Sequence, residues 1–129
     1  MRAALVASTV LALPDPSRPF VLHCDASDVG LGVVLSQLDP IGAERPVAFY
    51  SRSLNTAERN YSTTERELLA VVYAVTKCRH YIFGKPTQVV TDHRALQYLL
   101  GARDVSGRLA RWSLVIQQFD LTVMHLQLW

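Results

Sequence analysis

Cysteine is scarce in this sequence of 129 residues, which contains only Cys24 and Cys78. The two are far apart and belong to no C-x-x-C pair or histidine cluster. Zinc sites and disulfide frameworks need grouped cysteines, so neither kind of site is predicted. We expect Cys24 and Cys78 to be free thiols that pack in the core of an intracellular protein.

A strong excess of one charge is also absent, because 13 Lys and Arg residues are balanced by 11 Asp and Glu residues. The net charge of +2 does not by itself indicate a nucleic-acid-binding protein, so any contact with a polyanion must be local. A chain of 129 residues is long enough for one domain with a core and too short for two. One functional site is therefore expected.

Long apolar runs are missing as well. No run reaches the roughly 20 residues that a membrane span needs, so no contact with a membrane is predicted. Residues 1–14 combine one arginine, an apolar run and small residues, which is the composition of a secretory signal peptide. Composition alone leaves secretion open as an alternative.

Five short stretches have the branched, aromatic or alternating residues that are typical of strands. They are residues 20–24, 30–37, 46–51, 87–92 and 119–126. Short connections with turn-forming residues join the first three, which predicts an antiparallel meander. Asp25 follows the first stretch and Asp92 ends the fourth.

The clearest helix covers residues 63–81, between the third and fourth strands. Ser62 and Glu65 have the spacing of a capping box, and Gly84 follows the helix. The apolar positions that recur with the helical period are Leu68, Val71, Val72 and Val75. A strand, helix, strand crossover favours parallel neighbours. The other expected elements are a short helix, a loop and a second long helix, at residues 93–100, 101–107 and 108–118.

Three acids are candidates for chemistry. Asp25 and Asp92 end two strands, and Glu67 shares a helix face with apolar residues. Each also has a structural interpretation, because Asp commonly opens turns and Glu stabilises helix N-termini. Together, however, carboxylates that converge on one point are stable only with shared protons or with hard cations such as Mg²⁺. Two such ions about 3.5–4 Å apart promote in-line displacement at phosphorus.

Four ordered motifs carry a resemblance to a known family. They are "LHCDASDVGLGVVLSQ", "PVAFYSRSLNTAERNYSTTERELLAVVYAV", "VVTDHRALQYLL" and "GRLARWSLVIQQFDLTV". Over residues 20–123 the sequence resembles the ribonuclease H domain of a gypsy-type LTR retrotransposon polyprotein. The resemblance implies an α/β RNase H-like fold, in which a five-stranded mixed sheet of three antiparallel strands and parallel additions is flanked by helices. It also implies that residues 1–18 are the connector from the reverse transcriptase polymerase region, which argues against a signal peptide.

The resemblance implies hydrolysis of the RNA strand of an RNA–DNA hybrid with two Mg²⁺ ions, which Mn²⁺ can replace. It assigns catalysis and metal binding to Asp25, Glu67 and Asp92, whereas the capping box makes Glu65 a structural acid. The polymerase region of the parent polyprotein is the implied protein partner. Further candidates for nucleic-acid contacts are the turn at Ser27 and three arginines, Arg103, Arg108 and Arg111. The alternative interpretation of these arginines is that they are solvated surface charges.

The sequence departs from the family after its last strand. The family continues into a helix with a fourth acid, usually within a sequence like "ADALSR", whereas here "MHLQLW" takes that place. We therefore expect an RNase H-like domain at residues 19–127 without the final helix. Three alternatives remain: an active nuclease, a non-catalytic remnant that at most binds nucleic acid or a partner protein, and an integrase-like core.

Overall fold

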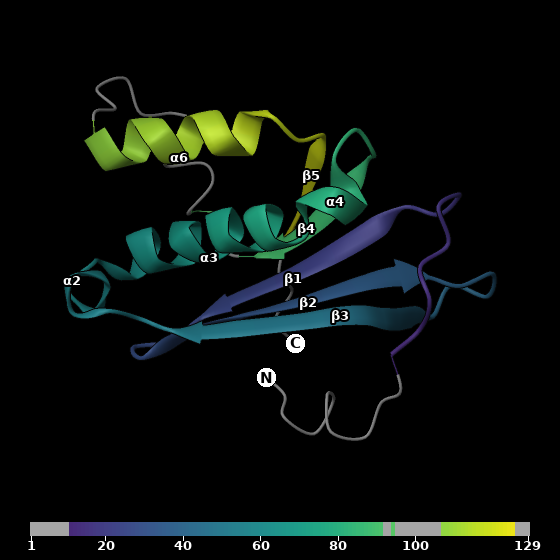
Figure 1. Cartoon of the computed structure of the whole chain (residues 1–129), viewed down its shortest axis with the longest axis horizontal. Helices are drawn as coiled ribbons and strands as arrows, with labels where there is room; N and C mark the ends of the chain where they lie inside the picture. Colours follow the sequence, from purple (N-terminus) through teal and green to yellow (C-terminus); the bar gives the residue numbers. More distant parts are fainter. Residues whose placement is uncertain (1–10, 92–93, 95–106, 126–129) are drawn as a thin grey trace.

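The computed structural model describes residues 11–91, 94 and 107–125. Its strands are β1 (Phe20–Ala26), β2 (Gly30–Leu38), β3 (Glu44–Ser53), β4 (Thr87–Thr91) and β5 (Leu121–His125). Its helices are α2 (Thr56–Arg59), α3 (Thr63–Lys77), α4 (Arg79–Ile82) and α6 (Gly107–Gln117). The strands form one sheet in the order β3-β2-β1-β4-β5 (Figure 1).

The sheet is mixed, as predicted. β1, β2 and β3 pair in antiparallel fashion, β4 lies parallel to β1, and β5 lies parallel to β4. β3 is longer than the predicted stretch of residues 46–51, and its pairing with β2 shifts register between Leu35 and Ser36. Because α2, α3 and α4 connect β3 to β4, β4 enters the sheet parallel to β1.

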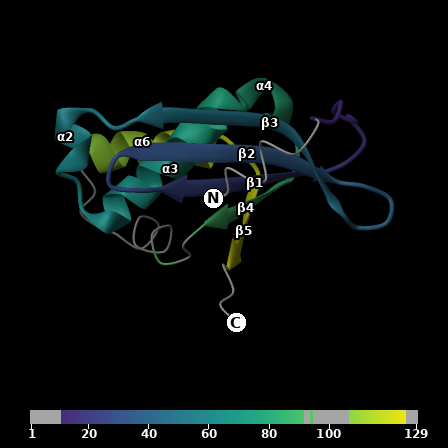
Figure 2. The same ribbon diagram turned by 90° about the horizontal axis from the view of Figure 1, so that it is seen from below.

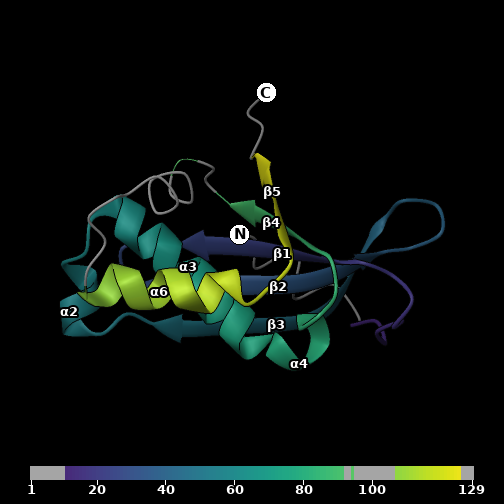
Figure 3. The ribbon, with the colours of Figure 1, turned by 90° about the horizontal axis from the view of Figure 1, so that it is seen from above.

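The helices cover one face of the sheet (Figures 1 and 3). Alternate residues of β2 point to this side, and Leu31, Val33 and Leu35 are buried there against α3. The predicted apolar face of α3 is also confirmed, because Leu68, Val71 and Val75 are fully buried and Val72 packs partly buried against the core. α6 packs against α3 as a further helix on the same side. Viewed from below, the sheet lies in front of the described helices (Figure 2).

The predicted start of the long helix is confirmed and its end is not. The Ser62 side chain accepts a hydrogen bond from the Glu65 amide, and the Glu65 carboxylate accepts one from the Ser62 amide. The helix stops at Lys77 rather than at residue 81, and α4 follows after Cys78. Gly84 then has a left-handed φ of 78°, which turns the chain toward β4.

Residues before β1 are fastened to the sheet by Gln37. Its side-chain amide donates to the backbone carbonyls of Asp15 and Arg18, at 2.8 and 3.0 Å. Its side-chain oxygen accepts from the Asp15 amide at 2.7 Å. Nearer the N-terminus, the Ala12 amide donates to the Pro46 carbonyl of the edge strand β3. The approach to β1 is therefore an ordered part of the fold.

Cys24 and Cys78 are both free, as expected. Burial raises the pKa of Cys78 to about 12, and burial with the nearby Cys78 also raises the pKa of Cys24. Neither is therefore an activated thiolate at neutral pH. Within the described ranges, no helix has the length and hydrophobicity to cross a membrane. Apart from residue 94, which is helical, the helix predicted at residues 93–100 lies outside the described residues, as does the predicted loop up to residue 106.

Candidate functional site

Asp25 lies near the end of β1, on the face of the sheet opposite the core. The register places Asp25 beside Gly32 of β2, and Gly32 beside Ser51 of β3. The adjacent residue Cys24 packs toward the core, so the carboxylate of Asp25 projects to the other side and is exposed. The predicted placement of Asp25 at the end of a strand is thus confirmed.

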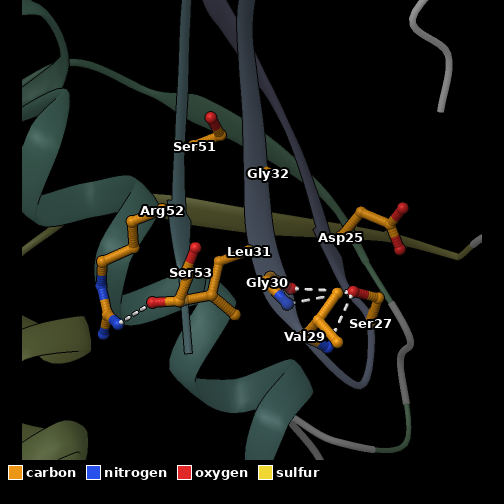
Figure 4. A pocket seen from close by; sticks show the side chains of 9 residues that line it. All are labelled: Asp25, Ser27, Val29, Gly30, Leu31, Gly32, Ser51, Arg52 and Ser53. Carbon is orange, nitrogen blue, oxygen red and sulfur yellow. Dashed lines mark hydrogen bonds between the residues drawn. The ribbon is translucent and has the colours of Figure 1, made fainter. Parts of the chain in front are cut away.

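A depression of about 580 Å³ lies beside Asp25. Its lining residues are Asp25, Ser27, Val29, Gly30, Leu31, Gly32, Ser51, Arg52 and Ser53. Figure 4 shows that the Asp25 carboxylate and the Arg52 guanidinium point in opposite directions. Small side chains make up most of the floor, which leaves space for a ligand next to the acid.

The turn between β1 and β2 is shaped by Ser27. Its hydroxyl accepts hydrogen bonds from the Val29 and Gly30 amides, at 3.2 and 3.1 Å. The Ser27 amide donates to the Gly30 carbonyl at 2.9 Å. The hydroxyl is thus used to close the turn (Figure 4).

The two glycines of β2 differ in the space around them. A Cβ added at Gly30 would lie 3.1 Å from the Arg52 carbonyl oxygen, so a side chain at this position would crowd the backbone of β3. A Cβ added at Gly32 would meet no heavy atom within 4 Å. The open space at Gly32 therefore belongs to the depression beside Asp25.

Glu67 is half-buried on α3, on the side of the helix that also carries the buried residues Ala70 and Val71. The first turn of α3 lies against the β1–β2 turn, because Arg66 donates to the Asp28 carboxylate at 3.2 Å. Glu67 follows Arg66 directly. The helix therefore brings Glu67 to the end of the sheet at which β1 carries Asp25, although Glu67 does not line the depression.

The third predicted acid, Asp92, lies outside the described residues. The preceding residue, Thr91, ends β4, which is the parallel neighbour of β1. The register pairs His23 with Val90, so β4 ends at the same end of the sheet as β1, near Asp25. In the described part of the chain, no group of three or more His, Cys, Asp and Glu side chains is placed to hold a metal.

Arg108 was a predicted phosphate contact, but its partners are other residues of the domain. It donates to the Glu65 carboxylate at 2.7 Å and lies over the Tyr61 ring, 4.1 Å from its centre. Glu65 is therefore a structural acid, as predicted, and hydrogen bonds from the Ser62 amide and Arg108 lower its pKa. Arg111 is exposed on α6, and Arg103 lies outside the described residues.

A partly buried ion pair next to the depression was not predicted. Arg52 donates to both carboxylate oxygens of Glu58, at 2.7 and 2.8 Å. Glu58 also forms a capping box with Asn55 at the start of α2, and the hydrogen bonds from Arg52 lower the pKa of Glu58. The Asn55-x-x-Glu58 spacing was the signal that could have revealed this helix.

Comparison with known proteins gives a family match over most of the chain. Residues 15–119 match the RNase H-like domain found in reverse transcriptase. The retrovirus-related Pol polyprotein of the transposon opus from Drosophila melanogaster is 40% identical over 126 residues, which are 97% of this chain and 12% of the polyprotein. The polyprotein of the gypsy transposon from the same organism is 38% identical over 90% of this chain and 11% of its own length. The chain thus spans a small part of these relatives.

Solved structures share the fold at low sequence identity. The foamy viral protease-reverse transcriptase in complex with dsDNA has a TM-score of 0.75 and 19% identity, over 98% of this chain and 27% of that chain. The structure of the foamy viral protease-reverse transcriptase in complex with an RNA/DNA hybrid has a TM-score of 0.68 and 20% identity, over 92% of this chain and 16% of that chain. RNase H1 from the halophilic archaeon Halobacterium salinarum has a TM-score of 0.58 and 15% identity, over 84% and 85%. The chain therefore belongs to the family of RNase H-like domains found in reverse transcriptases, and its relatives are retrovirus-related Pol polyproteins of transposons.

Proposed function

We propose that this domain hydrolyses the RNA strand of RNA–DNA hybrids, with Asp25, Glu67 and Asp92 as the acids of the site. The observation that carries the proposal is the exposed Asp25 beside a depression of small residues, at the sheet end to which α3 brings Glu67. Family membership supports it, as does a structural neighbour in complex with an RNA/DNA hybrid. We further propose residues 19–127 as the nuclease domain and residues 1–18 as a connector to a polymerase region.

The three proposed acids, Asp25, Glu67 and Asp92, are of a chemical type that binds divalent metal ions. Carboxylate oxygens are the ligands that Mg²⁺ prefers, and Mn²⁺ accepts the same set. Asp25 is exposed and its neighbours are small, so a hydrated cation has room at its carboxylate. The proposed third ligand, Asp92, lies outside the described residues. When bound, two Mg²⁺ ions would supply activation of the attacking water and stabilisation of the departing 3′ oxygen.

The other residues of the site orient the substrate. Selection of RNA requires contact with the 2′-hydroxyl, and the turn at Ser27 lines the same depression as Asp25. Gly32 and Ser51 place no large side chain on the sheet surface beside Asp25, so that a nucleic-acid backbone can approach the carboxylate. These residues therefore position a strand, whereas the acids hold the metal.

Incubation of the purified chain with Mg²⁺ and a labelled RNA–DNA hybrid tests this function. We expect cleavage of the RNA strand, with 5′-phosphate and 3′-hydroxyl ends, and no cleavage of the matching DNA duplex. Chelation of the metal should stop the reaction. Absence of cleavage together with retained hybrid binding would instead indicate a non-catalytic nucleic-acid-binding domain.

Gly32→Val should impair the site without harming the fold. The added side chain would rise beside Asp25, where no heavy atom lies within 4 Å of a new Cβ, and valine is favourable in a strand. We expect cleavage to fall by roughly 10-fold or more because the substrate is displaced, with an unchanged or higher Tm. Steady-state kinetics and thermal unfolding measure the two effects. Gly32→Ala is the smaller control, and full activity of Gly32→Val would show that the depression is not used.

A further inference from the structure

Arg66 of α3 has two unequal partners. One guanidinium nitrogen donates to the Tyr61 carbonyl at 2.6 Å, and the other donates to the Asp28 carboxylate at 3.2 Å. The side chain of Arg66 is only 15% exposed, whereas that of Asp28 is 92% exposed. The guanidinium is thus anchored to the backbone on one side and held on the other by an acid that is almost entirely in solvent.

The Asp28 contact is easily replaced. A single N–O contact to an exposed carboxylate contributes little, because water competes for both charges. The bond to the Tyr61 carbonyl keeps the guanidinium in place when Asp28 turns away. The planar fork of arginine matches the oxygens of a phosphate group, which is a better partner than one carboxylate oxygen. Arg66 is therefore prepared for exchange of one anion for another.

The location of Arg66 connects this exchange to the depression. Asp28 lies in the β1–β2 turn between Ser27 and Val29, both of which line the depression next to Asp25. Neighbouring Arg52 and Arg108 are instead paired with less exposed glutamates that also cap helices. Those two arginines hold the fold together, whereas Arg66 contacts an exposed acid in the turn that lines the depression.

We propose that Arg66 binds a phosphate of the nucleic-acid strand that enters the depression, and that Asp28 occupies its guanidinium until this phosphate replaces it. The proposal rests on the proposed function. It makes Asp28 a competitor of the substrate, so removal of the Asp28 charge should strengthen binding. A pair that only clamps the turn to the helix predicts the opposite.

Binding of a fluorescently labelled RNA–DNA hybrid, measured by anisotropy in EDTA so that no cleavage occurs, tests the exchange. Asp28→Asn should bind roughly 3-fold more tightly, and Arg66→Gln roughly 5- to 10-fold more weakly. The slope of log K against log salt should fall by about one in Arg66→Gln, as for the loss of one phosphate contact. In the Arg66→Gln background, Asp28→Asn should have no effect, because the two residues act through one contact.

Matched variants separate this contact from overall charge. Arg59→Gln and Asp120→Asn remove the same charges from exposed positions and should leave the affinity within about 2-fold of the native value. Arg66→Lys keeps the charge without the fork and should be intermediate. Weaker binding by Asp28→Asn, or an equal gain in the Arg66→Gln background, would overturn the exchange. Unchanged binding by Arg66→Gln would overturn the Arg66 contact alone, whereas no hybrid binding by the native chain would overturn the proposed function with it.

Discussion

Asp25→Asn is expected to lower the rate of RNA cleavage by at least about 100-fold, a loss of about 2.7 kcal/mol of transition-state stabilisation. Asparagine has nearly the same shape but lacks the negative charge that a divalent cation requires. Because Asp25 is exposed and makes no part of the core, the substitution should leave the fold unchanged. Initial rates with Mg²⁺ and a labelled RNA–DNA hybrid measure the effect, and Tm checks the fold.

Asp120→Asn is the matched control for this change. Asp120 is an exposed aspartate at the turn before β5, and its backbone carbonyl rather than its side chain bonds to the Thr87 amide. It should keep the native rate. Calorimetry with Mn²⁺ gives a second readout, since Asp25→Asn should also weaken metal binding. A native rate in Asp25→Asn would place the reacting centre away from the end of β1.

Local patterns predicted the elements that local physics determines. The strand β2, the capping box at Ser62 and Glu65, and the buried face of α3 all follow from composition, capping and periodicity within a few residues. The predicted end of the long helix was wrong because the apolar periodicity of the sequence continues past Cys78, whereas α3 ends before Cys78 and the short helix α4 follows it. Helix α2 was missed since four residues are too few for a periodic signal.

The site was predictable to the same extent. The end of β1 and the face of α3 could be derived from the chain, so the positions of Asp25 and Glu67 could be anticipated. The partners of the arginines could not, because Arg108 pairs with Glu65 and Arg66 with Asp28 across 43 and 38 positions of sequence. Only the folded arrangement of helices and turns shows which charges hold the fold and which remain available to a ligand.

Arg52→Met is expected to lower the free energy of unfolding by about 2 kcal/mol at pH 7. The substitution leaves Glu58 buried with one remaining donor, the Asn55 amide at 2.9 Å. It also removes the guanidinium from the Tyr73 ring. The loss should stay below the roughly 3–5 kcal/mol of a fully buried pair, because the Arg52 side chain is 37% exposed. Urea unfolding measures it.

The pH dependence of this loss identifies its cause. In the native chain Arg52 lowers the pKa of Glu58 from its ordinary value of 4.5, so the pair stabilises the fold above that value and loses its effect as pH falls through the lowered pKa. The difference between Arg52→Met and the native chain should therefore shrink as the pH falls below 4.5 and through the lowered pKa, as Glu58 becomes neutral in both. Arg59→Met, at an exposed position of α2, should cost less than about 0.5 kcal/mol throughout. Arg52→Met/Glu58→Gln should recover part of the stability, because no uncompensated charge is left. An equal loss at pH 7 and pH 3 would show that Arg52 acts through packing on Tyr73 instead of through Glu58.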